Sequence, residues 1–329
     1  MAYSQGGLIA ASDYNTIVGT SPSSTANTIN TVWAVGNGQY GYGQTAIGQV
    51  SSAGLVTAAQ WATAINNLNS IRTHQSGSGT GIGAPTSGSL ATYLSTFQTN
   101  VNTAYTNALT YASSGSTTTG TNNATGETNA TTQSAIAFTV TRTATFASAD
   151  QARYFFNAGG RLNFVISSVT NNDATARSAD MVTLLGTNMT GLSGFAAASN
   201  AGRTGTGGTV NTAATSIGYY GLTTTNQVLS QVTSATSGYT GDYVYIGAQS
   251  SGASGSNGDK GNVVTFTLYM YSAARAALPT APAAGPGGTP PTVNTSVNDS
   301  INVTVNHRVD IVYPEITNLS ASWGTVTIA

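Results

Sequence analysis

The sequence predicts an α+β protein, with an N-terminal helical region followed by an antiparallel β-sandwich-like domain. Three observations predict it. Up to about residue 113, apolar residues recur every three to four positions, which is the period of a helix. From about residue 135, apolar and polar residues alternate, which is the period of a strand. Residues 114–134 between them are mostly Ser, Thr, Gly and Asn, with Glu127 as the one charge, and they indicate a linker or exposed loop. The predicted divisions are therefore 1–113, 114–134 and 135–329.

Two short helices are expected first. Ser12 is a suitable N-cap for a helix at Asp13–Val18, and Gly19 is suited to end it. A second helix is expected within Thr25–Val35, which has apolar residues at helical spacing. The Gly-rich stretch that follows predicts a loop.

Two longer helices come next. Thr57–Arg72 places its large apolar residues on one face, with Thr57 as the N-cap. Ser89–Ala112 repeats its apolar residues, among them Leu94 and Val101, over about six turns. Its other face is Thr, Ser, Asn and Gln, and Thr and Asn are poor helix formers. This helix therefore needs a packing partner, either another helix of the chain or a copy in a neighbouring subunit.

The strand period begins at Ile136 and continues to Phe146. The segments Arg153–Asn157 and Arg161–Ser167 flank Gly159 and Gly160, and this pattern predicts a β-hairpin. Ala179–Leu185 is the only helical-looking segment in this half of the chain.

Five strands and one loop complete the prediction for the second half. The later strands are expected at Ser216–Tyr220, Gln227–Val232, Asp242–Gly247, Asn262–Tyr271 and Ser300–Val312. Leu278–Pro291 is rich in Pro and Gly, so it predicts a loop or arm rather than a central strand.

The composition is unusual for its low charge. Only 9 Lys and Arg and 10 Asp and Glu occur in 329 residues, whereas about a quarter of the residues of an ordinary soluble domain are charged. With 40% apolar residues the chain is expected to fold. A net charge of −1 provides no long-range attraction to nucleic acid or anionic lipid, and it lowers the barrier to self-association.

Other compositional features exclude further classes. No apolar stretch approaches the ~18 residues that span a membrane. Met1–Gly7 lacks a basic segment followed by an apolar one, so no signal peptide is predicted. Without Cys there is neither a disulfide framework nor a thiolate metal site.

The residues that could support catalysis are few. His74 and His307 lie far apart and have no metal-binding motif around them, so we assign them structural or solvated roles. A hydrolase would need two paired carboxylates, for which Asp150 and Asp242 are the candidates. With so few acidic residues in the chain, such a pair is not favoured. The sequence therefore predicts no catalytic residue, no cofactor and no metal site.

Aromatic residues in the loop Asn37–Gln44 are candidates for binding. Tyr40 lies between Gln39 and Gly41, Tyr42 lies between two glycines, and exposed rings of this kind can stack on sugars or bases. We favour a second interpretation, in which these tyrosines pack at subunit contacts. The triplets Asn123-Ala-Thr125 and Asn129-Ala-Thr131 match the glycosylation pattern, but such triplets arise by chance in a chain this rich in Asn and Thr.

Several short motifs together resemble a known family. They are Ala11-Ser-Asp-Tyr-Asn-Thr-Ile17, Tyr40-Gly-Tyr-Gly-Gln-Thr45, Val56-Thr-Ala-Ala-Gln-Trp61, Ile71-Arg-Thr-His-Gln75, Ala152-Arg-Tyr-Phe-Phe-Asn-Ala-Gly-Gly-Arg161, and the ending from Tyr313-Pro-Glu to Trp323-Gly324. They resemble the virion structural proteins, also called tail-fibre-like proteins, of tailed bacteriophages. The resemblance implies a place on the virus particle and no catalytic residue.

The predicted function is that of a non-enzymatic structural component of a tailed-phage virion, in the tail or fibre-attachment region. Its partners would be copies of itself, in threes or sixes as phage-tail symmetry implies, and other virion proteins, with neither nucleic acid nor membrane. Replacing Leu94 and Val101 by Asp is expected to weaken assembly or folding. The alternatives are an adhesin module that binds a host receptor or surface glycan, a depolymerase, and a capsid-decoration or head-fibre protein.

Overall fold

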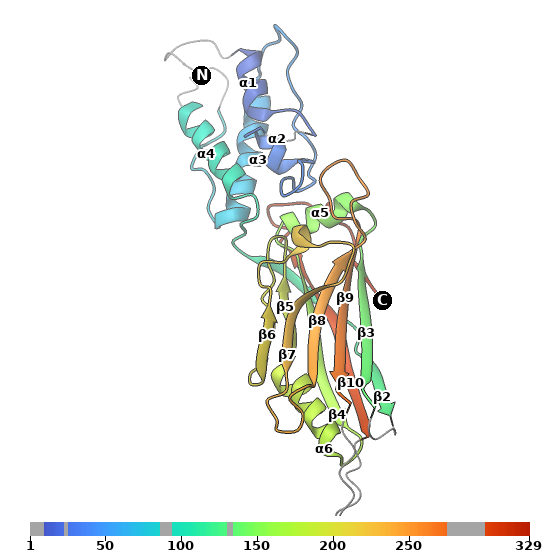
Figure 1. Cartoon of the computed structure of the whole chain (residues 1–329). Coiled ribbons are helices and arrows are strands. Elements are labelled where there is room, and N and C mark those ends of the chain that lie inside the picture. Colours follow the sequence, from blue (N-terminus) through green and yellow to red (C-terminus); the bar gives the residue numbers. More distant parts are fainter. Residues whose placement is uncertain (1–9, 23–25, 86–93, 130–133, 275–299) are drawn as a thin grey trace, which may run out of the picture.

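The computed structural model describes residues 10–22, 26–85, 94–129, 134–274 and 300–329. The chain is elongated (Figure 1). Four helices at one end, counted in the described parts of 10–109, form what we call the helical region. Two antiparallel sheets form the two-sheet region, residues 114–329. The mixed α+β class predicted from the sequence is confirmed.

The helical region contains α1 (Ala11–Val18), α2 (Ile29–Trp33), α3 (Ala58–Ser76) and α4 (Leu94–Thr106). Thr57 caps α3 as predicted, because its side chain accepts a hydrogen bond from the Gln60 amide and the Gln60 side chain bonds back to Thr57. Gly19 follows α1 with a φ of 74°, also as predicted. The prediction for Ser12 is wrong, since α1 begins at Ala11 and Ser12 lies inside it.

Helix α4 is shorter than predicted and packs within its own chain. It ends at Thr106 rather than Ala112, and residues 86–93 lie outside the described part of the chain. Phe97 and Val101 are each 1% exposed, and the Phe97 ring meets the Trp61 ring of α3 edge to face at 5.7 Å. The packing partner that the sequence requires is therefore supplied by the chain itself, and this stripe is not free to contact a second copy.

Replacing Val101 by Asp is expected to unfold the helical region, because the carboxylate would have no partner in the apolar interior. We expect the free energy of unfolding to fall by ~3 kcal/mol or more. Asn102→Asp, on the exposed side of the same helix, is the matched control and should change little. Thermal unfolding followed by circular dichroism tests both variants, and equal melting curves would contradict the packing described. The side chain of Leu94 lies outside the described residues.

The five-stranded sheet is built around β10. Its strands are β1 (Ser114–Thr118), β2 (Asn123–Asn129), β4 (Arg161–Asn171), β5 (Gly191–Phe195) and β10 (Ile301–Pro314). Their order is β1-β10-β4-β5, and β2 also pairs with β10. Because β4 covers one edge of β10, β1 and β2 follow one another along its other edge.

The six-stranded sheet lies in front of the first in Figure 1. Its strands are β3 (Ile136–Thr145), β6 (Thr209–Ala213), β7 (Gln227–Thr233), β8 (Tyr243–Ser250), β9 (Val263–Ser272) and β11 (Thr327–Ile328). Their order is β11-β3-β9-β8-β7-β6. All the strand pairs are antiparallel.

The two sheets bury their facing side chains against one another. On β9, the residues predicted to share one face, Val264, Phe266, Leu268 and Met270, are all 0% exposed. The Phe266 ring contacts rings of the other sheet, with centroids 6.0 Å from Phe164 and 5.3 Å from Phe195. Rings at these distances add to the free energy gained by burying apolar area.

Three predictions in this half are wrong. The expected linker at 114–134 contains β1 and β2, which bond to β10 through their backbones and so need no apolar period. The expected strand Arg153–Asn157 belongs to a helix, α5 (Ala149–Asn157), capped by Ser148. Ser216–Tyr220 is not a strand; a 3₁₀ turn occupies Tyr219–Gly221. The helical signal near Ala179 is confirmed by α6 (Ala176–Thr183), which continues into a π-helical turn at Leu184–Asn188. Leu278–Pro291 lies outside the described residues.

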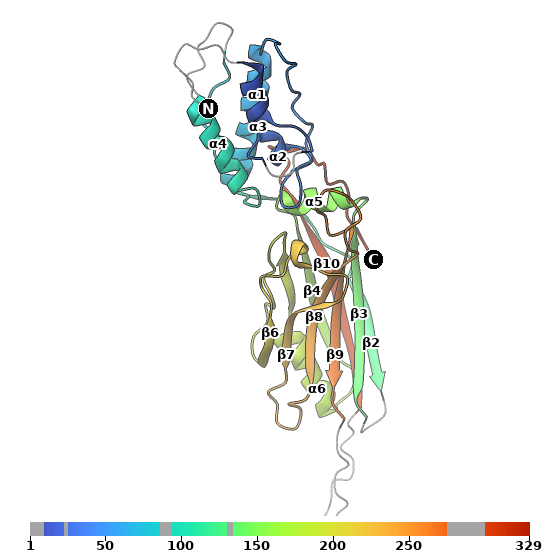
Figure 2. The same ribbon diagram turned by 45° about the horizontal axis from the view of Figure 1, so that its top comes forward.

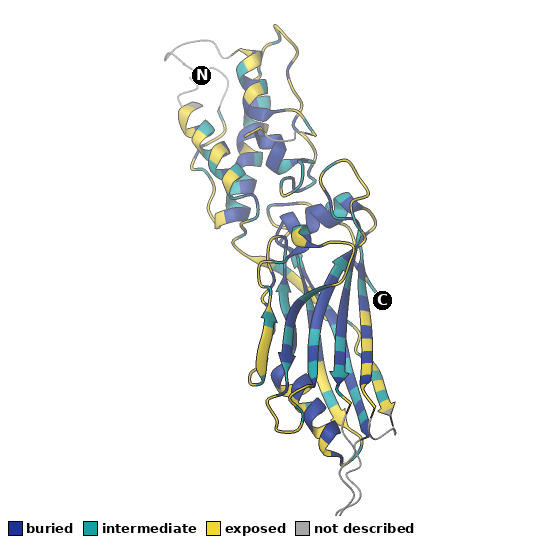
Figure 3. Ribbon diagram, viewed as in Figure 1, coloured by how far each residue is buried: buried dark blue, intermediate teal, exposed yellow. Residues whose placement is uncertain are grey.

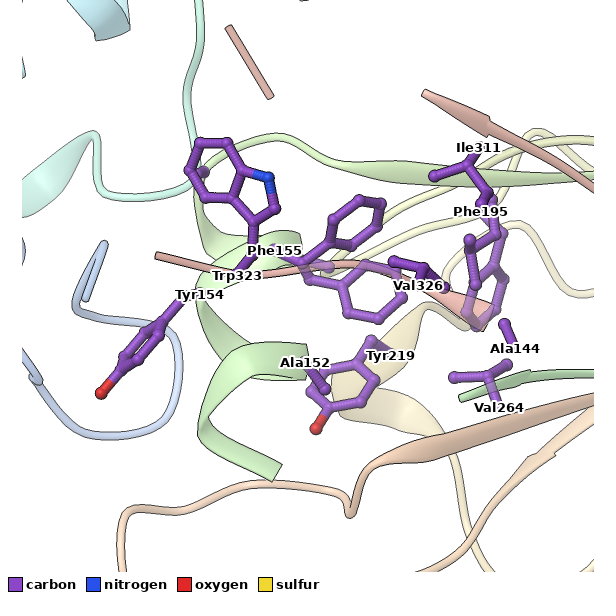
Figure 4. Packing of buried hydrophobic residues seen from close by; sticks show 14 of the residues in the cluster. Ala144, Ala152, Tyr154, Phe155, Phe195, Tyr219, Val264, Ile311, Trp323 and Val326 are labelled. Carbon is purple, nitrogen blue, oxygen red and sulfur yellow. The ribbon is translucent and has the colours of Figure 1, made fainter. Parts of the chain in front are cut away.

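Helix α5 sits between the helical region and the end of the two sheets (Figures 1 and 2). On the side facing the sheets, Ala152, Phe155 and Phe156 are at most 1% exposed. Figure 4 shows Phe155 on the same side as Phe195 and Val326, whereas Tyr154 points the other way. The helix therefore closes the end of the core and presents its opposite side to the helical region.

Candidate functional site

The predicted histidines are both buried in structural contacts. His74 is 1% exposed at the end of α3, and its Nδ1 lies 2.9 Å from Glu315 Oε1. Burial lowers the pKa of His74, and the Glu315 carboxylate opposes that shift. Glu315 also accepts from the amides of Thr317 and Asn318. This pair joins the helical region to the segment after β10, and it supports the structural role predicted for His74.

His307 lies on the inner face of β10. It is 2% exposed, its Nε2 is 3.0 Å from Thr125 Oγ1 of β2, and its ring is parallel to that of Phe164. Burial, together with the nearby Arg142 charge, lowers the pKa of His307 to about 4. Arg142 comes from β3 and is also buried, with the Asn123 amide beside its guanidinium. Asn123 of the first glycosylation-like triplet thus packs within the chain, and the side chain of Asn129 lies outside the described residues.

Asp150 and Asp242 do not form a pair. Asp242 is fully buried just before β8, where it accepts from Ser272 Oγ at 2.7 Å and from the Ala273 amide at 2.9 Å. Asp150 is on α5 near Asn257, which follows the other end of β8. The length of β8 separates them, about 26 Å at ~3.3 Å per residue. The hydrolase built on these two carboxylates is therefore excluded.

Neither metal sites nor membrane spans are found in the described parts of the chain. The residues placed there contain no cluster of three or more His, Asp or Glu side chains that could hold a metal ion. None of the helices placed there combines the length and the apolar character needed to cross a bilayer.

The Tyr40–Tyr42 loop is an internal contact. Tyr42 is 0% exposed, and its hydroxyl donates to the Ala108 carbonyl at 2.9 Å and accepts from Gln75 Nε2 at 3.2 Å. The half-buried Tyr40 stacks on Tyr105, with ring centroids 4.3 Å apart. Tyr42 is thus closed to a sugar and equally to a second subunit, and both sequence interpretations of Tyr42 are wrong.

This loop is held by α5 through Arg153, a residue whose role the sequence did not reveal. Arg153 is 0% exposed. Its guanidinium donates to the carbonyls of Val35, Gly38 and Tyr40 at 2.9–3.1 Å, and its Nε lies 3.1 Å from Asp150 Oδ1. One buried cation therefore fixes the turn of the loop by three main-chain contacts.

Neighbouring side chains complete what we call the junction, the contact of loop 35–44 with α5 and the two-sheet region. Asn157 donates to three carbonyls of the loop, including that of Gly38, and the Tyr220 hydroxyl donates to Gly38 as well. Gly43 has a φ of 70°, and a Cβ there would come within 2.4 Å of the Tyr154 ring, so only glycine fits. Gln44 adds two hydrogen bonds to the backbone of Ser320.

A helical pattern was available for these residues. Ser148 precedes Ala152, Phe155 and Phe156, which are spaced as one face of a helix, while Arg153 and Asn157 are four apart on the opposite side. The Gly159-Gly160 pair favoured a hairpin instead. The sequence could have revealed the helix, whereas the loop carbonyls that Arg153 binds have no sequence signal.

The charged residues that the structure describes are more buried than is usual for such side chains. Among the residues that the structure describes, every Asp, Glu, Lys and Arg is buried or half-buried when the whole residue is counted, and the Asp150 side chain is 40% exposed. Seven of them are buried: Arg142, Arg153, Arg177, Asp180, Asp242, Asp259 and Glu315. The solvent-facing surface of this part of the chain is consequently made mainly of hydroxyl, amide and small apolar groups.

A row of tyrosines stands on the outer side of the six-stranded sheet. Tyr243 lies opposite Tyr271, and Tyr245 lies opposite Tyr269, on the adjacent strands β8 and β9. All four are half-buried, and they alternate with fully buried residues along both strands (Figure 3). Their flanking partners on β3 and β7 are uncharged: Ala137, Thr139, Gln231 and Thr233. We call these eight residues the tyrosine face.

The rings of the tyrosine face contact one another, stacked in the Tyr245–Tyr269 pair and tilted in the other two pairs. Successive centroids are 5.0 Å apart for Tyr271 and Tyr243, 6.0 Å for Tyr243 and Tyr269, and 4.9 Å for Tyr269 and Tyr245, with interplanar angles of 20–33°. The flat sides that would stack on a sugar are thereby partly covered by neighbours. Burial raises the pKa of Tyr243 and Tyr245 still further above neutral pH, where a tyrosine hydroxyl is protonated in any case. The face offers ring edges and hydroxyl groups, which suit contact with another uncharged protein surface.

No protein-family model matches this chain, no curated protein matches it, and no solved structure matches it.

Proposed function

We propose that this protein is a non-enzymatic structural component of a tailed-phage virion, in the tail or fibre-attachment region, which acts by packing in a symmetric assembly. The observation that carries the proposal is the position of the charges. Among the described residues, seven of the charged residues are buried and the others are half-buried. Proteins that diffuse alone depend on exposed charge to stay apart, whereas a part with a fixed place in an assembly does not.

The architecture supports a connecting role. In this proposal the helical region is the N-terminal assembly region and the two-sheet region is a β-sandwich-like domain that projects from it. The junction contacts of Arg153 and Asn157, together with the separate His74–Glu315 pair, hold the two at a fixed angle. A fixed angle suits a component that must pass its orientation on to a neighbour.

Self-association is part of the proposal, with three or six copies implied by the resemblance to phage-tail proteins. The apolar side of α4 does not support self-association, since Val101 is buried within the chain. The tyrosine face takes its place as the proposed contact. It is uncharged, and tyrosine is enriched at protein interfaces.

Replacing Tyr269 by Glu is expected to weaken self-association at least about tenfold, because an unpaired carboxylate would be desolvated in the contact. Folding should be retained, since the position is at the surface of the sheet. Leu55→Glu is the matched control, because Leu55 is 90% exposed in the helical region. Sedimentation velocity at several concentrations measures the effect. Equal association of both variants and the wild type would remove the tyrosine face from the proposal.

The decisive experiment is a cryo-electron microscopy map of the intact particle, which gives the position, the copy number and the neighbours together. We expect the protein to remain on purified particles through a moderate-salt wash, because few ionic contacts are available to be screened. Its absence from purified particles, or its early release by salt, would overturn the proposal. A capsid-decoration or head-fibre position would still leave it within the structural class.

One observation favours a second candidate function, a receptor- or glycan-binding adhesin. The tyrosine face combines aromatic rings with many hydroxyl and amide groups, which also suit a neutral sugar. Because neighbouring rings cover one another, we rank this function second. Glycan-array binding by the wild-type protein that Tyr269→Glu abolishes would reverse the order.

A further inference from the structure

The chain has two Asn-Gly steps, and folding brings them together at the junction. They are Asn37-Gly38 and Asn257-Gly258. The Gly38 amide donates to the Asn257 carbonyl at 2.7 Å. A Cβ on Gly258 would lie 2.5 Å from Asn37 Oδ1 and 3.0 Å from the Gly38 nitrogen, so the two turns are in direct contact. Both glycines have a positive φ, which only glycine adopts readily.

We propose that Asn257 is a site of spontaneous covalent modification, converted through a cyclic imide to aspartate and isoaspartate, and that the same fold protects Asn37. In the first step the Gly258 nitrogen bonds to the side-chain carbonyl carbon of Asn257. The bond from that carbon to Nδ2 breaks, and the Gly258 amide proton leaves with Nδ2 as ammonia. Water then opens the ring at either carbonyl, giving aspartate or isoaspartate. Water is the only co-reactant, so atoms balance without an oxidant or a reductant.

The two Asn-Gly dipeptides differ in whether the glycine nitrogen that attacks is already hydrogen-bonded. The Gly38 nitrogen is tied to the Asn257 carbonyl, and to attack Asn37 it must give up that bond. The Gly258 amide has no hydrogen-bond partner among the described residues, and Gly258 is exposed to water. At Asn257, Nδ2 lies 3.3 Å from both carboxylate oxygens of Asp150, which accept hydrogen bonds from the departing nitrogen.

The modification would act on the junction. It places a new carboxylate at residue 257 where an amide donated to Asp150, and two like charges at that distance repel. Isoaspartate also lengthens the main chain by one carbon at the residue whose carbonyl holds Gly38. Asp150 in turn bonds to Arg153, so the change reaches the cation that fixes loop 35–44.

The test compares the conversion of the two Asn-Gly dipeptides in the folded and unfolded full-length chain. Protein is aged at mildly alkaline pH with and without denaturant, and peptide mapping by mass spectrometry measures conversion at residues 37 and 257. In the unfolded chain the two rates should be similar. In the folded chain residue 257 should convert several times faster than residue 37. A ratio that does not rise on folding, or a folded chain in which residue 257 stays intact while the unfolded chain converts fully, would overturn the proposal.

A second measurement examines the consequence. Asn257→Asp reproduces the new charge without the longer backbone, and it should lower the midpoint of thermal unfolding. Asn102→Asp, on the exposed side of α4, adds the same charge away from the junction and should leave the midpoint unchanged. Equal midpoints for the two variants would show that the new carboxylate does not weaken the junction.

Discussion

Replacing Arg153 by Met is expected to lower the free energy of unfolding by about 3 kcal/mol, because buried main-chain carbonyls lose a charged donor. The change leaves the Val35, Gly38 and Tyr40 carbonyls without the donor that the guanidinium supplied. Buried acceptors that lose their donor cost about 1–3 kcal/mol each, less whatever the Asn157 side chain still satisfies. Urea denaturation followed by fluorescence and circular dichroism measures the loss.

The form of the transition is as informative as its midpoint. In the wild type the junction couples both regions, so we expect them to unfold together. In Arg153→Met the helical region should unfold first, because its loop has lost its main attachment. Lys260→Met is the matched control, since Lys260 is half-buried and makes no side-chain contact of this kind. Arg153→Lys should rescue little, because an ammonium group cannot span three carbonyls and Asp150. A variant as stable as the Lys260 control would contradict the role assigned to Arg153.

Acidification is expected to destabilise the protein well above the range in which its carboxylates are protonated. In the unfolded chain a histidine has a pKa near 6.5, whereas that of His307 in the fold is about 4. Below pH 6.5 His307 therefore binds a proton in the unfolded chain but not in the folded chain. The free energy of unfolding falls until the pH reaches about 4. The full loss is about 3 kcal/mol, of which about 2 kcal/mol falls between pH 6.5 and 5.

Denaturation series at pH 7 and pH 5 test this dependence with His307→Asn. The variant should lose most of the difference between the two pH values. Some slope should remain, because the pKa of His74 is lowered by burial as well. The carboxylates of Asp173, Asp259 and Glu315 have lowered pKa values, so their stabilising effect is lost only at lower pH. An unchanged slope in His307→Asn would show that His307 is protonated in the fold as easily as in the unfolded chain.

The sequence predicted those elements whose side chains alternate or repeat. Strand β9 was found because Val264, Phe266, Leu268 and Met270 all turn to the core. Helix α3 was found because its cap at Thr57 and its apolar spacing agree. In both cases burial on one side imposes a period on the residues.

Helix α5 was missed although its cap and apolar spacing were present, because the glycine pair after it favoured a hairpin. The other features missed are held by backbone bonds or by distant partners. Strands β1 and β2 lie on the edge of the sheet and carry mostly exposed Ser, Thr and Asn, so no period marks them. The burial of Tyr42 depends on contacts with Gln75 and Ala108, which are far along the chain. The local sequence gives no sign of these contacts, and it predicted a surface position. Sequence spacing reports local periodicity, and it contains no record of which distant segments meet.

The direction of the strands has a mechanical consequence. Strands β4, β8, β9 and β10 run along the long axis of the molecule, and the helical region is attached at one end of that axis (Figure 1). Tension between the helical region and the far end of the sheets is therefore parallel to the strands. The interstrand hydrogen bonds are perpendicular to it, so a whole ladder is loaded in shear at once rather than opened bond by bond. At the near end the same tension crosses the buried contacts of Arg153 and Asn157 with loop 35–44, which makes them the coupling through which a pull on one region would reach the other.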